Sequence, residues 1–282
     1  MKCLAFTMIS NDPKQFGQFL LSLPYAMIPD WQHSLYLVIQ YPFDLKKLAE
    51  FDEIIWRINK TNNLTMIVDV IPPIIRKGNV LDFLGARRHF LKRIENDHND
   101  YIYWCDDDFR FNSGERSYLH ASSADRIYDS CCYLDDNPSC GLVQHMTFFG
   151  GSQAGLKIKP VRGGFFETGI GFTMRGHETP YIDKRFNFFG AGSDVAVYIT
   201  KIMNGYHIAR NYNNPTRKRP TNQVVPGNPN THYDLNYITT KGFIHQLREM
   251  TGGYYKYGKE PPKEIKALHR IGASLKGLNP FY

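Results

Sequence analysis

Short apolar segments alternate with amphipathic segments along the first half of the chain, and this alternation constrains the fold more than any other feature. The apolar segments are continuous and end at polar or turn-forming residues, as strands buried on both faces do. The expected strands span residues 3–9, 35–40, 54–58, 66–71 and 101–105. The expected helices span residues 13–23, 44–51 and 80–96. Such alternation predicts an α/β fold with a single Rossmann-like, mostly parallel sheet flanked by helices.

The second half of the chain has a different character. Residues 141–150 and 165–174 are apolar runs next to glycine pairs, which predicts two further strands. A helix is expected to begin at Ser193 or Asp194 and to end near Met203. In sheets of this kind ligands bind at the carboxyl ends of the strands, so the functional residues are expected in the loops that follow them.

Charge is distributed unevenly along the chain. The net charge is +7, but residues 201–282 hold 13 Lys and Arg against 4 Asp and Glu, whereas residues 1–200 hold 21 against 23. Residues 211–232 contain four prolines and many asparagines, which predicts a long polar loop. We therefore expect a core over residues 1–205 and a basic, loop-rich extension over residues 206–282. The extension suggests a polyanionic partner, or a solvated basic surface without one.

Three aspartates, Asp106, Asp107 and Asp108, directly follow the apolar strand expected at residues 101–105. Clustered carboxylates repel one another unless a cation or a basic group lies close by. In a strand-like geometry Asp106 and Asp108 point to the same side. Because Mg²⁺ or Mn²⁺ takes carboxylate oxygens together with phosphate oxygens and water, Asp106 and Asp108 are predicted to hold such an ion. The alternative is an acidic helix start or a solvated turn.

The helix expected at residues 80–96 carries an arginine in its apolar stripe. Apolar residues recur on one face of this helix, and Arg87 completes their spacing. Arg87 is therefore expected to point toward the protein, whereas Arg88 and Arg93 are freer to face solvent. An inward guanidinium needs an anionic partner, and either a diphosphate or the aspartate cluster meets that need. The alternative is an arginine that snorkels from the edge of the stripe.

Asp194 follows a glycine-bearing turn at an expected helix start. Its ordinary role is to cap the helix. A carboxylate in this place can also accept the proton of an acceptor hydroxyl. Among the scattered histidines, His207 and His232 are candidates for a third metal ligand, and their alternative is a surface or hydrogen-bonded histidine.

Several function classes lose support from the sequence. It contains no GxSxG, Walker A, HExxH or GxGxxG motif, which are the usual marks of hydrolases, nucleoside triphosphatases and dinucleotide-binding enzymes. Five cysteines without a CxxC spacing do not form a disulfide framework, so free thiols in a reducing, cytosolic setting are expected. No segment reaches transmembrane length, and the N-terminus reads as a strand, so we expect neither an anchor nor a membrane partner.

The order of these features resembles the GT-A glycosyltransferases. That family opens its nucleotide pocket with an N-terminal strand, faces the donor with a helix arginine, ends a strand in a DxD motif, and has a later acidic residue at a helix start. The resemblance covers about residues 1–205 and implies a nucleotide-sugar donor, usually a UDP-sugar, with Mn²⁺ or Mg²⁺. It implies that Arg87, Asp106 and Asp107 bind the donor and that Asp194 is the base. Here the acidic helix start reads Ser-Asp, where many relatives have Glu-Asp.

With its basic C-terminal third, the chain looks most like the phage glycosyltransferases that modify hydroxylated pyrimidines in DNA, and like the base-J glucosyltransferase group. This resemblance implies a DNA acceptor in the cytosol of an infected host cell. Arg217, Lys218 and Arg219 are the predicted DNA contacts. Two alternatives stay open: a cytosolic glycosyltransferase with a polysaccharide, lipid or protein acceptor, and a non-catalytic nucleic-acid-binding protein. The oligomeric state stays open as well.

Overall fold

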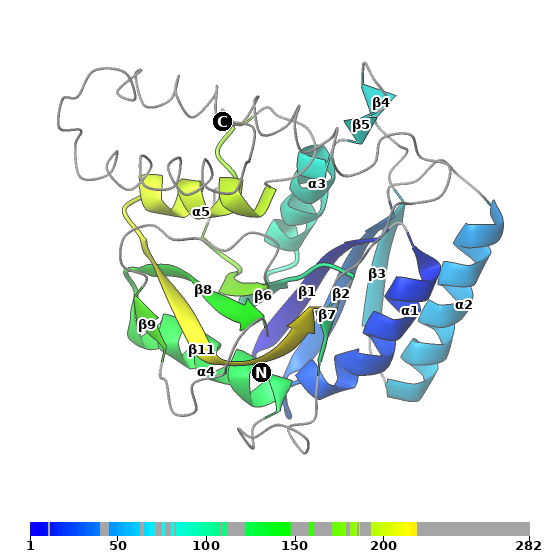
Figure 1. The fold of residues 1–282 in the computed structure, drawn as a ribbon, viewed down its shortest axis with the longest axis horizontal. Helices are drawn as coiled ribbons and strands as arrows, with labels where there is room; N and C mark the ends of the chain where they lie inside the picture. Colours follow the sequence, from blue (N-terminus) through cyan, green and yellow to red (C-terminus); the bar gives the residue numbers. More distant parts are fainter. Residues whose placement is uncertain are drawn as a thin grey trace.

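The computed structural model contains one large sheet. The structure describes residues 1–10, 12–39, 45–62, 65–70, 75–76, 80–81, 83–107, 109–111, 122–147, 158–160, 171–178, 181–184, 186 and 193–218. The strands of the sheet are β1 (Cys3–Ser10), β2 (Gln32–Ile39), β3 (Thr65–Val70), β6 (Tyr101–Trp104), β7 (Phe109–Arg110), β8 (Cys140–Thr147), β9 (Lys159–Pro160), β10 (Phe172–Arg175) and β11 (His207–Lys218). Within the described residues their order is β3-β2-β1-β6-β10-β8-β11-β7, and β9 pairs with β11 (Figure 1).

The first half of the chain supplies the parallel part of this sheet. Strands β3, β2, β1 and β6 run parallel, with β1 buried along nearly its whole length. Because the carboxyl ends of parallel strands lie at the same edge, the end of β6 brings Asp106 to the edge where β1 also ends. This edge is called the carboxyl edge below.

The second half of the chain makes the sheet mixed. Strand β10 is antiparallel to both β6 and β8, and β11 is parallel to β8. At its far end β11 turns to pair antiparallel with β7, the short strand that follows the aspartate cluster. Strand β11 is the last described strand, and it belongs to the same sheet as the first half of the chain. It does so although it follows residue 205, where the core was predicted to end.

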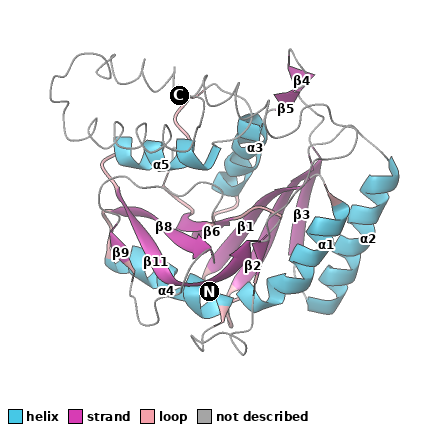
Figure 2. Ribbon diagram, viewed as in Figure 1, coloured by secondary structure: helices cyan, strands magenta, loops and turns pink. Residues whose placement is uncertain are grey.

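Helices cover both faces of the sheet and give the molecule three layers (Figure 2). The helices are α1 (Pro13–Ser22), the 3₁₀ turn η1 (Leu23–Ala26), α2 (Leu45–Asn62), α3 (Phe83–Asn96), α4 (Ser123–Asp136) and α5 (Ser193–Met203). Helices α3 and α5 pack on one face, and α1, α2 and α4 pack on the other. A separate small hairpin joins β4 (Ile75–Arg76) to β5 (Val80–Leu81).

Two elements begin where their sequences predict. Asp12 caps α1 by accepting from the backbone N–H groups of Lys14 and Gln15, and Pro13 takes the first helical position. Helix α5 spans the predicted residues from Ser193 to Met203. The α/β class and the sheet flanked by helices are thus confirmed, with more antiparallel pairing than the alternation of the first half indicates.

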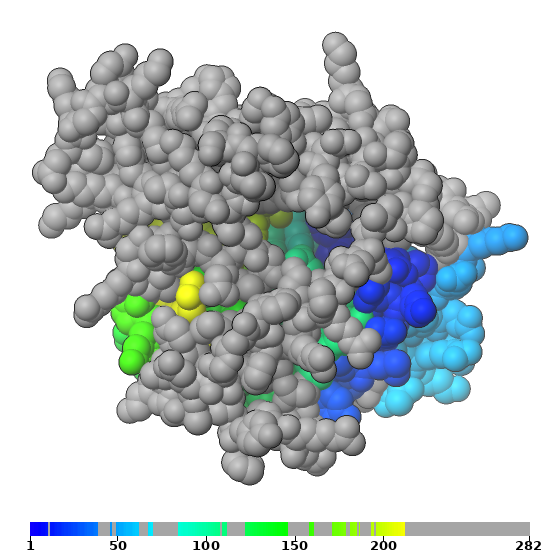
Figure 3. All heavy atoms as spheres, in the orientation of Figure 1, coloured from blue at the N-terminus to red at the C-terminus, as the bar shows by residue number. Residues whose placement is uncertain are grey.

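The strand predicted at residues 54–58 is wrong, because α2 continues through this segment. Ile55 and Ile58 are buried, whereas Trp56 is 61% exposed. One-sided burial with a spacing of three is the pattern of an amphipathic helix. In the sequence, the apolar residues of this segment resemble a buried strand. The exposed Trp56 shows that only one face of the segment is buried. In the space-filling view α1 and α2 (blue) form one side of the molecule (Figure 3).

The loop predicted at residues 211–232 is wrong over residues 211–218, which form the second part of β11. Asparagine and proline favour turns in an isolated segment. Here the neighbouring strands β8 and β7 supply hydrogen-bond partners, which outweighs the local preference. Residues 219–232 and the helix predicted in the C-terminal tail lie outside the described residues.

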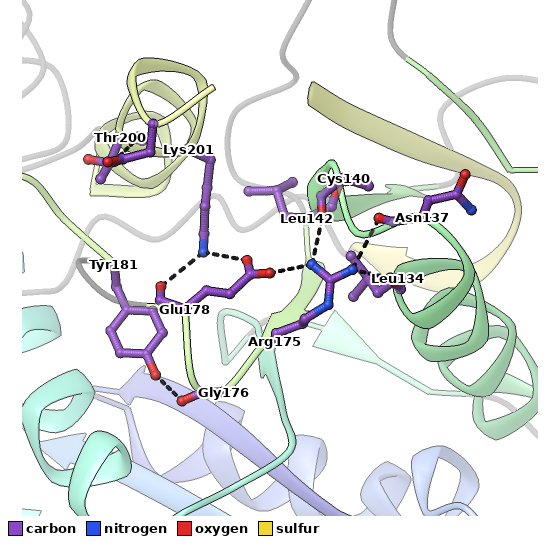
Figure 4. Close-up of polar contacts among 11 residues, drawn as sticks. Leu134, Asn137, Cys140, Leu142, Arg175, Gly176, Glu178, Tyr181, Thr200 and Lys201 are labelled. Carbon is purple, nitrogen blue, oxygen red and sulfur yellow. Dashed lines mark hydrogen bonds and ion pairs between the residues drawn. The ribbon is translucent and has the colours of Figure 1, made fainter. Parts of the chain in front are cut away.

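A buried ion network ties α5 to β10 and α4 (Figure 4). Arg175, at the end of β10, forms an ion pair with Glu178, and Glu178 Oε2 accepts from Lys201 Nζ at 3.0 Å. The side chains of Lys201 and Glu178 are 2% and 11% exposed. The Arg175 guanidinium also donates to three main-chain carbonyl oxygens, those of Leu134, Asn137 and Cys140. This network fixes the C-terminal end of α5, and so sets where its N-terminal end lies.

Among the described residues no helix combines the length and the apolarity needed to cross a membrane. All five cysteines are free thiols, as the sequence predicts.

Candidate active site

Arg87 and Asp106 form an ion pair at the carboxyl edge. Arg87 lies on α3, and its NH2 group donates to Asp106 Oδ1 at 2.8 Å. Its side chain is only 5% exposed, whereas that of Asp106 is 37% exposed. The inward position predicted from the apolar stripe is therefore confirmed, and its anionic partner is the aspartate cluster.

Aromatic rings hold the Arg87 guanidinium in place. It lies 4.2 Å from the centre of the Trp104 ring and 5.5 Å from that of Phe90. Cation–π contacts of this kind strengthen when water is excluded. Burial lowers the pKa of Arg87, and the negative charges of Asp106 and Asp194 oppose that shift. The guanidinium stays charged because its ordinary pKa is above 12, so it is a fixed positive charge under the aspartate cluster.

Asp107 is bound to a different part of the chain. Its Oδ2 accepts from Ser10 Oγ at 2.7 Å, and Ser10 is the last residue of β1. The two aspartates therefore separate, since Asp106 turns to α3 and Asp107 to the end of β1. The segment is not extended as the sequence suggests, because the N–H of Phe109 donates to the carbonyl oxygen of Asp106 and closes a turn after β6.

Asp194 lies in the first turn of α5 and is 8% exposed. Its negative charge acts on both Arg87 and Tyr198, which places its carboxyl group near the Arg87–Asp106 pair. Helices α3 and α5 also contact each other directly. The structure thus brings Arg87, Asp106 and Asp194 together from three elements that are far apart in the sequence.

The structure describes only some of the other predicted site residues. Asp108, His232 and Arg219 lie outside the described residues. Arg217 and Lys218 are the last residues of β11, and their backbones pair with Arg110 and Phe109. The basic segment predicted to bind DNA therefore begins directly beside the strand that follows the aspartate cluster.

Two expectations about polar residues are wrong. His207 pairs with Cys140 at the start of β8, at the opposite edge of the sheet from Asp106, so it is not a ligand of that site. Arg88 does not face solvent freely, because it donates to the carbonyl oxygens of Asp183 and Phe186 at 2.8 and 2.6 Å. Arg93 does lie at the surface, where it pairs with Asp69.

The described part of the site fits a hard divalent cation. Asp106 offers a carboxylate whose side chain is 37% exposed and which the Arg87 guanidinium holds by an ion pair. Oxygen ligands of this kind suit Mg²⁺ and Mn²⁺, which complete their coordination with phosphate and water. Within the described residues no group of three or more His, Cys, Asp or Glu side chains forms a metal cage. An ion bound here would take some of its ligands from the phosphate groups of a bound substrate.

Sequence reasoning missed three buried polar residues near Asp194. Tyr198 and Gln144 are fully buried, and Arg210 is 9% exposed. Gln144 and Arg210 lie on neighbouring strands, and Tyr198 lies on α5. Of the three, only Gln144 carries a sequence signal, since it is a polar residue that directly follows an apolar run in its strand.

Comparison with known proteins shows the fold of the chain. No family model and no curated protein matches it. TarS 1–349 of S. aureus in complex with UDP-GlcNAc is similar in structure, with a TM-score of 0.59 and 14% identity, over 98% of this chain and 72% of that chain. The mannosyltransferase PcManGT of Pyrobaculum calidifontis, in complex with GDP-Man and Mn²⁺, matches with a TM-score of 0.52 and 12% identity, over 97% and 69%. The chain therefore has the GT-A glycosyltransferase fold, as its sequence predicts.

Proposed function

We propose that this protein is a metal-dependent glycosyltransferase that moves a sugar from a nucleotide-sugar to a hydroxyl group. The observation that carries this proposal is the meeting of Arg87, Asp106 and Asp194 at the carboxyl edge of a GT-A sheet. In such folds ligands bind at this edge. The similar structures bind UDP-GlcNAc and GDP-Man, which supports a nucleoside diphosphate sugar as the donor.

The reaction breaks the bond between the sugar C1 and the donor phosphate oxygen and forms a bond from C1 to the acceptor oxygen. When bound, the metal neutralises the negative charge that grows on the departing diphosphate. Asp106 and Asp108 would hold this ion. Arg87 keeps Asp106 oriented through their ion pair. Asp194, whose own side chain is largely buried, accepts the proton of the attacking hydroxyl.

For the acceptor we propose DNA that carries a hydroxylated pyrimidine. The support is the basic C-terminal third, with 13 Lys and Arg against 4 Asp and Glu, and the pairing of β11 with β7. This pairing starts the basic segment of Arg217 and Lys218 at the carboxyl edge. A polyanion held there by its backbone can present one base to the site.

The donor experiment is incubation with a panel of UDP- and GDP-sugars and Mn²⁺ or Mg²⁺, followed by mass spectrometry of the released nucleotide. We expect metal-dependent release that EDTA removes. Asp108→Asn should abolish it and leave the fold intact, while Asp52→Asn, an exposed carboxylate on α2, should not change it. Full release by Asp108→Asn in EDTA would contradict the proposed metal site, and no release with any donor would leave the non-catalytic binding protein as the better reading.

The acceptor experiment compares DNA that contains hydroxymethylcytosine with plain DNA of the same sequence. Mass spectrometry of the nucleosides should show a hexose or pentose added only to the hydroxylated base. Donor turnover without any sugar on the DNA would favour a polysaccharide, lipid or protein acceptor instead.

A further inference from the structure

Arg110 of β7 binds the backbone of the aspartate turn, the turn of residues 106–109 that the Phe109 N–H closes. Its Nη1 group donates to the carbonyl oxygens of Asp107 and Phe109, at 2.7 and 2.6 Å. These two residues flank Asp108 in the sequence. A guanidinium can only donate and a carbonyl oxygen can only accept, so the direction of both contacts is certain. The residues before and after Asp108 are therefore held by a single side-chain group.

The same guanidinium is also bound to helix α1, which packs against β7. Its Nη2 group donates to Gln15 Oε1 at 2.6 Å and to Gln18 Oε1 at 3.0 Å. Residues three apart share one face of a helix, so the two amides form one docking point for Arg110. Because the guanidinium is planar and rigid, its two terminal nitrogen atoms keep a fixed separation. Arg110 thus joins the aspartate turn to α1 through one rigid group.

A second contact ties the aspartate turn to the same part of the chain. Ser10, the last residue of β1, donates to Asp107 Oδ2 at 2.7 Å. Ser10 Oγ also accepts from the backbone N–H of Asp12, the residue that caps α1, at 3.4 Å. The end of β1 and the start of α1 therefore hold the turn at two points. Ser10 binds the side chain of Asp107, and Arg110 binds its main chain.

We propose that Arg110 is a positioning residue for the divalent ion, because it fixes the turn that carries the metal-binding carboxylates. The inference rests on the proposed function, since this ion serves the proposed reaction. Arg87 orients the side chain of Asp106, and Arg110 orients the main chain that follows it. Clustered carboxylates repel one another, so a turn without this tie would spread in the absence of the ion and bind it less tightly.

The sign of the effect distinguishes positioning from charge. A guanidinium close to a metal site repels a divalent cation, so on charge alone the removal of Arg110 would tighten the binding of the ion. Positioning predicts the opposite, because partners that orient metal ligands contribute about ten- to a hundredfold to metal affinity. A purely structural role would lower the stability of the protein and leave the metal affinity of the folded molecules unchanged.

The experiment is a Mn²⁺ titration in saturating UDP or GDP, read from the electron paramagnetic resonance signal of free Mn²⁺. Arg110→Met should weaken Mn²⁺ binding by about tenfold or more. Arg110→Lys should not restore it, because an ammonium group cannot reproduce the two-nitrogen fork. Nucleotide binding in EDTA should be unchanged. The matched control is Arg126→Met, which removes a buried arginine of α4 and its ion pair with Asp129 and should leave Mn²⁺ affinity unchanged.

A second variant keeps the test decisive if Arg110→Met does not fold. The joint change of Gln15→Met and Gln18→Met removes the two acceptors on α1 and retains Arg110. We expect it to weaken Mn²⁺ binding in the same direction, by a smaller factor. Wild-type protein that binds Mn²⁺ with UDP or GDP, beside folded variants of equal or tighter affinity, would overturn the role of Arg110 and leave the function standing. Wild-type protein without metal-dependent nucleotide binding would instead refute the metal site of the proposed function.

Discussion

At the residue scale, the Arg87–Asp106 pair is asymmetric. The guanidinium is almost inaccessible to water, while the carboxylate keeps more than a third of its surface exposed. A buried charge without its partner is costly, whereas an exposed carboxylate can be hydrated. The pair is therefore suited to hold Asp106 in one orientation and still present it to a ligand.

This asymmetry predicts that Arg87→Ala weakens metal-dependent binding of the nucleotide-sugar by about tenfold or more, because partners of metal ligands set their orientation. The measurement is calorimetric titration with the donor and Mn²⁺. Lys92→Ala is the matched control, since Lys92 is an exposed cation on the same helix. Arg88→Ala is a poorer control, because Arg88 binds two carbonyl oxygens. Equal, small effects for Arg87→Ala and Lys92→Ala would show that Arg87 only fills its place in the helix stripe.

Residues of the site were predictable where a regular pattern identifies them. The apolar stripe of α3 predicts that Arg87 is buried, and the end of the β6 strand predicts where Asp106 lies. The contact between Gln144 and Arg210 was not predictable, because it depends on which strands become neighbours. Strands β8 and β11 are far apart in the sequence, and no local pattern states their pairing.

At the element scale, α5 is fixed at both ends. Asp194 faces the candidate site at its start, and Lys201 binds Glu178 near its end. Glu178 is the shared anion of two buried cations, Lys201 and Arg175. The position of the proposed base thus depends on a network at the other end of its helix.

Glu178→Gln should therefore destabilise the protein strongly, because it leaves two buried cations without their carboxylate. We expect a loss of about 3–5 kcal/mol in the free energy of unfolding, measured by urea denaturation. Lys201→Met should cost at least about 2 kcal/mol less, since Glu178 keeps Arg175 and an apolar chain of similar length fills the space. A Lys201→Met protein that is as unstable as Glu178→Gln would contradict this account.

Elements were predictable where local signals are strong, as with the Asp12 cap and Pro13 of α1. Helix α4 was not predicted, although Ser122 and Asp125 form a capping box at its start. Its buried side chains follow the helical period. That signal was available in the sequence, whereas the strand character of residues 211–218 was not, because it comes from pairing with β8 and β7.

At the scale of the whole molecule, two buried histidines make stability depend on pH. Burial lowers the pKa of His33 to about 4 and that of His145 to about 3. His33 Nε2 accepts from the backbone N–H of Ile28 at 3.0 Å, which requires the neutral ring. In the unfolded chain a histidine has a pKa near 6.5.

Between pH 6.5 and these lowered values the unfolded chain binds more protons than the folded protein. Stability is therefore fully present above pH 6.5 and falls as the pH drops, by about 2 kcal/mol per histidine at pH 5. Urea unfolding at pH 7.5 and pH 5 should show this loss. His33→Gln should reduce it, and His177→Gln, at an exposed position, should not. An unchanged pH dependence in His33→Gln would contradict the assignment.

The basic segment gives a prediction about long-range charge. If DNA is the acceptor, joint replacement of Arg217, Lys218 and Arg219 by Ala should weaken binding and reduce its salt dependence, by about 0.9 in the log–log slope for each lost phosphate contact. Binding titrations at several salt concentrations measure this slope. Because β11 pairs with β7 beside the aspartate cluster, we also expect some loss of donor turnover. An unchanged slope would remove DNA as the proposed acceptor.

The position of β11 also has a consequence for how the chain matures on the ribosome. Strand β8 is synthesised well before β11, and until β11 arrives β8 has an open side. Open strand edges recruit other chains and lead to aggregation. A nascent chain stopped after residue 205 would expose the β8 edge and leave β7 without its partner. The edge of β8 is therefore covered only after the synthesis of β11, the strand whose end lies beside the aspartate cluster.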